Sequence, residues 1–281
     1  SRLKGLLSFG WKLLGSTLLD TVYSNLRNLI IGKVYSSSDL AFYNQADRFP
    51  RILVTNVNSS IDSVLLPSMS NVQNDHYRVK SMTRRAIKTS TYIMAPLMMG
   101  LAFCAPSIVQ LVLTEKWLPC VPYLRIFCIT YMFWPIHTAN LNAINALGRS
   151  DLFLKLEIAK KTVGIILLLI TMRISVLAMA YSMIVSSVSS QIINTWPNKR
   201  LLEYGYLEQL KDILPSILLA VFMGILVSFF KLTNWNVLTV LICQILSGAL
   251  IYVLGSIILK LESFEYLINI LKGLKRRNTN D

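Results

Sequence analysis

The hydrophobic residues of the chain gather in runs long enough to cross a lipid bilayer. A spanning helix needs about 20 mostly apolar residues, and the windows of that length or longer cover residues 91–113, 119–147, 162–197, 213–231 and 236–259. The stretch 156–197, which includes the third window, is too long for one crossing and contains Arg173, so we divide it into spans over 156–172 and 175–197. The apolar pattern therefore predicts six transmembrane helices.

Two further segments, 8–33 and 40–70, carry polar residues on one side only. At about 100° per residue, the polar residues fall within roughly 120° of one another in the first segment and about 80° in the second. They are Lys12, Ser16, Asp20, Tyr23, Ser24 and Arg27, and then Asn44, Asp47, Arg51, Thr55, Asn58 and Asp62. Such a stripe can face protein or water while the opposite face contacts lipid. We therefore expect an all-α integral membrane protein with about eight transmembrane helices.

Composition and charge exclude a nucleic-acid-binding protein. The 281-residue chain is 54% hydrophobic and 15% charged, with a formal net charge of +14. Nucleic-acid-binding proteins carry their basic residues on a polar surface, whereas here these residues lie between apolar runs. With eight spans, nineteen of the 28 lysines and arginines fall on the side that holds both termini, and four fall on the other side. The positive-inside rule then predicts that both termini are cytoplasmic.

The last segment, 261–277, is predicted to lie on the membrane surface. Its apolar residues recur at helical spacing and are followed by Lys275, Arg276 and Arg277. Amphipathic helices with a basic end bind the surface of anionic membranes. We therefore expect an amphipathic basic tail on the cytoplasmic side, with membrane lipids as its partners.

The sequence contains none of the usual motifs for catalysis or metal binding. It has no phosphate-binding loop, no H-E-x-x-H and no G-x-S-x-G. Its cysteines, Cys104, Cys120, Cys128 and Cys243, lie in apolar stretches without a C-x-x-C pair, which indicates inert apolar residues. We expect no enzyme, no cofactor and no metal. For His137, in the fourth span, packing against a neighbouring helix is favoured over proton or substrate contact.

Charged residues within the first two spans carry the main functional signal. One charge at the centre of a spanning helix costs about 2.5–3.5 kcal/mol, so these residues must pair or face water. In one interpretation, neutralised pairs such as Asp47 and Arg51, four residues apart, hold two helices together. In the other, arginines line a hydrated cavity and bind an anionic substrate, because a guanidinium group binds phosphate or carboxylate oxygens bidentately. Asp20 and Asp62 could also carry a proton.

Three stretches resemble a known family of exporters. They are the opening run from Ser8 to Ser16, the run from Asp39 to Pro50 (DLAFYNQADRFP), and the run from Leu141 to Asp151 (LNAINALGRSD), which is followed by Glu157, Lys160 and Lys161. In this order they resemble the polysaccharide (O-antigen type, Wzx-like) flippases of the multidrug/oligosaccharidyl-lipid/polysaccharide exporter superfamily. The nearest branch is that of the colanic-acid and teichuronic-acid exporters.

The resemblance implies an organisation and a set of site residues. Residues 1–200 would form the C-terminal six-helix lobe of an exporter, 201–260 two additional spans, and 261–281 the cytoplasmic tail. The implied substrate-binding residues are Arg27, Arg48, Arg51, Arg125, Asn44 and Asn58. The implied ion-coupling residues are Asp20, Asp47, Asp62 and His137. The chain would be an incomplete fragment without the N-terminal lobe, and we expect it not to transport by itself.

The resemblance also implies partners, and two alternative functions remain open. The substrate would be a polyprenyl-pyrophosphate-linked oligosaccharide moved across the bacterial cytoplasmic membrane by alternating access. The other partners would be the missing N-terminal lobe and the polysaccharide polymerase machinery. A multidrug or lipid-precursor exporter would share the architecture but would favour an acidic, aromatic cavity. A membrane enzyme acting on lipid-linked sugars would need large outer loops, and the predicted outer loops are only a few residues long.

Overall fold

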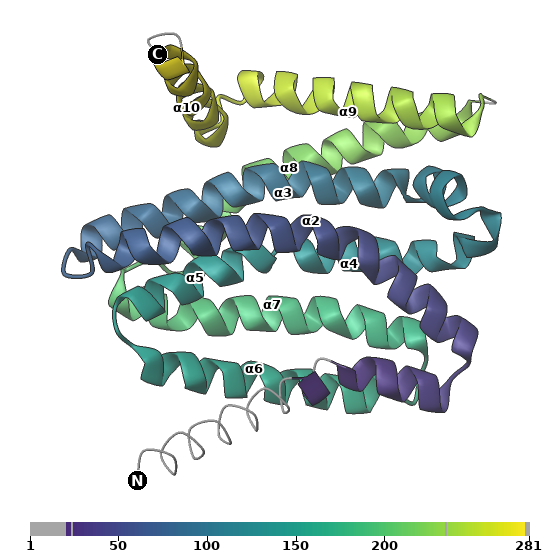
Figure 1. Cartoon of the computed structure of the whole chain (residues 1–281), viewed down its shortest axis with the longest axis horizontal. Helices are drawn as coiled ribbons and strands as arrows, with labels where there is room; N and C mark the ends of the chain where they lie inside the picture. Colours follow the sequence, from purple (N-terminus) through teal and green to yellow (C-terminus); the bar gives the residue numbers. More distant parts are fainter. Residues whose placement is uncertain (1–20, 24, 234, 279–281) are drawn as a thin grey trace.

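The fold consists of helices joined by short turns. The computed structural model describes residues 21–23, 25–233 and 235–278, and no strand occurs among them (Figure 1). Residues 25–34, the first helical segment, precede the labelled helices. These are α2 (Ser37–Ser70), α3 (His76–Leu113), η1 (Glu115–Cys120), α4 (Val121–Met132), α5 (Trp134–Ala146), α6 (Ser150–Thr171), α7 (Val176–Leu201), α8 (Tyr206–Ser228), η2 (Phe229–Leu232), α9 (Val237–Ile258) and α10 (Glu262–Asn278).

In the described part of the chain, four helices are long and apolar enough to cross a membrane. They are α3, α7, α8 with η2, and α9. The amphipathic second segment forms one 34-residue helix, α2. A capping box begins it, because the backbone N–H of Asp39 donates to Oγ of Ser36 at 3.1 Å and the N–H of Ser36 donates to the Asp39 carboxylate at 3.3 Å. The expectation of an all-α, multi-pass membrane protein is confirmed.

The fourth predicted span, 119–147, is not one helix. It is divided among η1, α4 and α5, and α4 ends beside Phe133. Proline lacks a backbone N–H and therefore favours helix starts, and Pro122 and Pro135 lie in the first turns of α4 and α5. This part of the bundle therefore consists of two short helices, α4 and α5, in place of one long helix.

The stretches between the predicted spans are also mostly helical. They include residues 71–90, 148–155 and 198–212, into which α3, α6, α7 and α8 extend. The start of α3 shows the reason, because Asp75 caps the helix by accepting the N–H of Arg78 at 3.0 Å. Hydropathy marks where a helix meets lipid, whereas caps mark where it begins.

The helices pack as a bundle with distinct edges (Figure 1). Helices α2, α3, α4 and α5 contact one another, α6 pairs with α7, and α8 packs along α3. Helix α9 lies at one edge against α3 and α8, and the first helical segment lies near α6 at the opposite edge. The largest hydrophobic cluster includes Met94, Met98, Leu124, Phe127 and Met179, from α3, α4 and α7.

Helix α9 shows how a spanning helix divides its surface. Its buried residues recur at intervals of four, which places them on one face. They are Val240, Gln244, Gly248, Tyr252 and Ser256. Large hydrophobic side chains such as Leu246, Leu250 and Ile258 are exposed on the remaining surface. In a membrane, this exposed apolar surface contacts lipid, which a soluble protein would not tolerate over so large an area.

Candidate functional site

A polar cavity of about 490 Å³ lies between the first helical segment and helices α2, α4, α5, α6 and α7. Its side chains come from six stretches of the chain that are far apart in sequence. They include Tyr23, Arg27, Asp47, Arg51, Tyr131, Trp134, His137, Glu157, Lys160, Ser186, Ser187, Ser190 and Asn194. Asp47 and Arg51, from the polar stripe of α2, thus face Ser186, Ser187 and Ser190 of α7 across a shared space.

An acid, an arginine and a tyrosine form the centre of the cavity wall. The guanidinium of Arg51 lies 2.6 Å from the carboxylate of Asp47, one turn away on α2. The hydroxyl of Tyr131 on α4 donates to the other carboxylate oxygen, and the Arg51 guanidinium lies 5.9 Å from the Tyr131 ring centroid. The Asp47 side chain is only 16% exposed, whereas that of Arg51 is 54% exposed. Asp47 is therefore held in place, and Arg51 presents its remaining donors to the cavity.

Arg27 anchors the first helical segment to α7. Its Nη1 donates to the backbone carbonyl of Met179 at 2.6 Å and to the hydroxyl of Ser182 at 3.0 Å. On the wall formed by α6, Lys160 pairs with Glu157 one turn before it. The described charges of the cavity are thus three basic residues and two acidic residues, so the cavity is weakly basic.

His137 combines the two roles weighed from the sequence. Its ring lies 3.5 Å from Oγ of Ser187 and 3.4 Å from the side-chain amide of Asn194, both on the neighbouring helix α7. It also borders the cavity. The residue therefore packs against another helix at a position where it could also contact a ligand.

The structure brings some of the predicted site residues together and leaves others outside. Arg27, Asp47, Arg51 and His137 line the cavity. Asn44, Arg48, Asn58, Asp62 and Arg125 are not part of its lining.

The residues outside the cavity have varied surroundings. Asn58 is buried, and its Oδ1 has no hydrogen-bond partner. Asp62 accepts from the amide of Asn142 at 2.8 Å, whereas Nε of Arg125 donates to the carbonyl of Ala102 at 3.3 Å. Asn44 and Arg48 are exposed on α2. Asp20 lies outside the described residues.

Comparisons with known proteins agree with the expected family. A family model described as "Polysaccharide biosynthesis protein" matches residues 1–122. The teichuronic acid biosynthesis protein TuaB of Bacillus subtilis is 24% identical over 225 residues, which cover 80% of this chain and 47% of TuaB. The lipopolysaccharide biosynthesis protein WzxC of Escherichia coli is 23% identical over 154 residues, or 55% of this chain and 31% of WzxC.

A solved structure has the same fold. The lipid II flippase MurJ in an inward closed conformation matches 92% of this chain and 54% of its own, with a TM-score of 0.72 and 20% sequence identity. These similarities support the resemblance to polysaccharide flippases. The chain spans about half the length of TuaB and of MurJ.

Several lining residues of the polar cavity were missed in the sequence. Glu157 and Lys160 lie on α6, within a predicted span, but they were not among the predicted site residues. Tyr131 was missed because no local pattern relates it to Asp47, 84 residues away. Ser186, Ser187 and Ser190 of α7 were not among the predicted site residues either, yet they line the cavity.

Metal-binding side chains do not gather at the described positions. No group of three histidine, cysteine or carboxylate side chains there could hold a metal ion. The cysteines form no disulfide, and three of them are buried. The polar groups of the cavity are suited to binding through hydrogen bonds and charge.

Proposed function

We propose that the chain takes part in flipping a polyprenyl-pyrophosphate-linked oligosaccharide across the bacterial cytoplasmic membrane, and that it acts by binding and conformational change without enzymatic chemistry. The observation that carries the proposal is the half-exposed Arg51 in a polar cavity enclosed by helices. The MurJ-like fold and the relatives named for polysaccharide biosynthesis support it.

The geometry suggests how the head group binds. A pyrophosphate offers oxygens that compete with Asp47 for the Arg51 guanidinium, because both are anionic acceptors with suitable spacing. Tyr131 and Trp134, whose ring centroids are 5.2 Å apart, add aromatic surface beside it for the sugar rings. The polyprenyl chain stays in the lipid.

Asp47 is the favoured ion-coupling residue of this proposal, with His137 as a second. A coupling cation bound at Asp47 would neutralise the negative charge that holds Arg51 on its own helix. The arginine would then be free for the substrate phosphate, so cation binding and substrate binding would favour the same state. Asp20 and Asp62 remain coupling candidates, and Arg48, Arg125, Asn44 and Asn58 remain binding candidates, from sequence alone.

The proposal includes partners and an orientation. The polar cavity would be completed by a second lobe like the remaining half of the longer relatives, and the exported product would pass to polymerase machinery. Both termini of the chain would face the cytoplasm. Membrane-impermeant thiol labelling from outside spheroplasts would test this orientation, with Ser38→Cys expected to react and Asn74→Cys expected to be protected. The reverse pattern would contradict it.

Ligand binding by the purified full chain tests the cavity assignment. With the chain in phosphatidylcholine nanodiscs, we expect undecaprenyl pyrophosphate to change its tryptophan fluorescence in a saturable manner. Arg51→Gln should weaken binding at least roughly tenfold, because hydrogen bonds to charged groups contribute about 1.5–3 kcal/mol.

The matched control is Arg78→Gln, which alters an exposed arginine at the start of α3 outside the cavity. It should change the affinity less than about twofold. Equal affinities for the wild type and Arg51→Gln would contradict the cavity assignment. Released phosphate or a transferred sugar would contradict the absence of enzymatic chemistry.

A further inference from the structure

A second charged cavity, of about 340 Å³, lies between α3 and α10, at the end of the bundle that the loop charges predict to be cytoplasmic. Its lining includes the basic residues Arg84, Arg85 and Lys88 and the hydroxyl residues Ser81, Thr89 and Ser263. Basic and hydroxyl side chains together are the donors that bind phosphate oxygens. The cavity is separate from the polar cavity beside Arg51 and has no residue in common with it.

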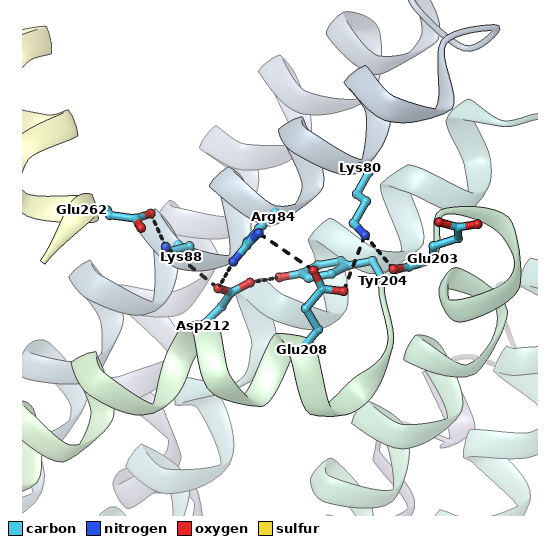
Figure 2. A network of polar contacts seen from close by, with 8 residues as sticks. All are labelled: Lys80, Arg84, Lys88, Glu203, Tyr204, Glu208, Asp212 and Glu262. Atoms are coloured by element: carbon cyan, nitrogen blue, oxygen red, sulfur yellow. Dashed lines mark hydrogen bonds and ion pairs between the residues drawn. The ribbon is translucent and has the colours of Figure 1, made fainter.

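Two of the basic residues are already paired with carboxylates (Figure 2). Arg84 lies 2.7 Å from Asp212 and 3.8 Å from Glu208, both on α8. Lys88 pairs with Glu262 at the start of α10 and lies 3.9 Å from Asp212. These contacts join three helices, and they leave little positive charge from Arg84 and Lys88 for a ligand.

Arg85 is different from its neighbours. Its guanidinium lies 5.0 Å from the ring centroid of Tyr266 on α10. No carboxylate lies within ion-pair distance of it in the described ranges. The side chain is exposed at the cavity, so its charge is available to an anion. Glu262 is 80% exposed and could turn away into solvent, which would free Lys88 as a second cation.

An apolar groove of about 630 Å³ adjoins the basic cavity. Arg85, Thr89 and Tyr266 line both spaces. Beyond them the groove follows α2 and α3, with the apolar residues Ile61 and Ile93 among its lining. A phosphate at Arg85 would therefore lie at the mouth of a groove suited to a hydrocarbon chain.

We propose that the two spaces together bind one anionic glycerophospholipid of the inner leaflet. Its phosphate lies at Arg85 among the hydroxyls of Ser81, Thr89 and Ser263, and one acyl chain lies in the groove between α2 and α3. The charge of Arg85 favours an anionic head group, because the amine of a zwitterionic lipid would bring a second positive charge beside it. The continuous groove favours a lipid over free phosphate.

Short-chain lipids can test this site on the purified full chain in a zwitterionic detergent. Dioctanoyl phosphatidylglycerol should bind at least roughly tenfold more tightly than dioctanoyl phosphatidylcholine or inorganic phosphate, measured by native mass spectrometry and by the shift in melting temperature. Arg85→Gln should remove most of the preference for phosphatidylglycerol, and Arg85→Lys should restore part of it.

A second variant tests the groove. Ser60 is an exposed groove residue whose hydroxyl bonds only the carbonyl of Asn56 on its own helix, at 2.9 Å. Ser60→Trp should fill the groove and weaken phosphatidylglycerol binding severalfold, with phosphate binding unchanged. The matched control is Arg78→Gln, which removes an exposed arginine at the start of α3 outside both spaces and should leave lipid binding unchanged.

Three results would overturn the proposal. One is equal binding of phosphatidylglycerol and phosphatidylcholine. Another is equal binding of phosphatidylglycerol and inorganic phosphate, which would indicate a phosphate site without an acyl chain. The third is displacement of phosphatidylglycerol by far lower concentrations of undecaprenyl phosphate, which would assign the site to the exported lipid. None of these results depends on Arg51, so the two proposed sites can fail independently.

Discussion

The two charged regions of the molecule are built on different principles. In the polar cavity, the central ion pair joins Asp47 and Arg51 of the same helix, one turn apart. At the predicted cytoplasmic end, the ion pairs join residues of different helices: Arg84 and Lys88 of α3 meet Asp212 of α8 and Glu262 of α10 (Figure 2). The first pair forms whenever α2 is helical, whereas the second set forms only when three helices are in place.

This difference indicates that the pair in the polar cavity serves binding, whereas the pairs between helices at the cytoplasmic end serve stability. A pair within one helix can open without moving a helix, and exposed pairs of this kind contribute only about 0.3–0.5 kcal/mol to stability. Asp212 is 6% exposed and depends on partners from a neighbouring helix, so loss of its interactions affects packing. We therefore expect substitutions at the cytoplasmic end to change stability and those in the polar cavity to change binding.

The largest stability effect is expected for Asp212→Asn. The substitution keeps the shape of the side chain but removes the charge that faces Arg84 and Lys88. We expect the free energy of unfolding to fall by about 2 kcal/mol, below the 3–5 kcal/mol typical of fully buried pairs because Arg84 is partly exposed. Unfolding in mixed micelles with increasing dodecyl sulfate would measure this loss.

The control for Asp212→Asn is Asp75→Asn. Asp75 pairs with the exposed Arg78, and asparagine also caps helices well, so the loss should stay below about 0.5 kcal/mol. Equal losses for the two variants would remove the distinction between the interhelical network and an ordinary surface pair.

A smaller effect is expected for Tyr204→Phe, in the turn before α8. The Tyr204 hydroxyl donates to Asp212 at 2.9 Å, and loss of this hydrogen bond should cost about 1 kcal/mol. Burial, and then the negative charge of Asp212, raise the pKa of Tyr204 well above its ordinary value of 10.

The raised pKa of Tyr204 gives this variant a pH signature. The folded state retains the phenol proton longer than the unfolded state, so the stability that this group contributes is complete below pH 10 and falls as the pH rises above it. The difference in unfolding free energy between the wild type and Tyr204→Phe should therefore shrink above pH 10. A difference that is constant up to pH 11 would show that Tyr204 does not titrate as proposed.

The smallest stability effect is expected for Asp47→Asn, in the polar cavity. Asparagine can still accept the hydroxyl of Tyr131, and Arg51 can turn to solvent, so the loss should stay below about 0.5 kcal/mol. Arg51 loses its competing carboxylate, and undecaprenyl pyrophosphate should bind about threefold more tightly in the fluorescence titration. A large loss of stability with unchanged binding would mean that this pair also holds the fold.

Local features of both regions could be predicted from the sequence. The pairing of Asp47 with Arg51 follows from a spacing of four residues in a helix, and the structure confirms it. The long α2 was likewise predicted from the angular distribution of its polar residues. These features depend on neighbours within one or two turns, so the helical period is enough to find them.

Features that depend on tertiary packing could not be predicted. The contact between Tyr131 and Asp47 requires α4 to lie beside α2, and the pairing of Arg84 with Asp212 joins residues 128 positions apart. Arg48 and Arg51 looked equivalent as charges in a span, yet only Arg51 reaches the cavity. Lys160 was not predicted as a site residue, because hydropathy detects the lipid-facing part of a helix and not the polar residues at its end.

The break between α4 and α5 has a mechanical consequence. Two short helices that meet at Phe133 can change their mutual angle without losing a hydrogen bond inside either one, whereas a single long helix of the same length would have to be bent. Tyr131 precedes the joint, Trp134 and His137 follow it, and all three line the polar cavity. A small rotation of α4 relative to α5 would therefore require little energy. It would separate Tyr131 from His137 and change the width of the cavity.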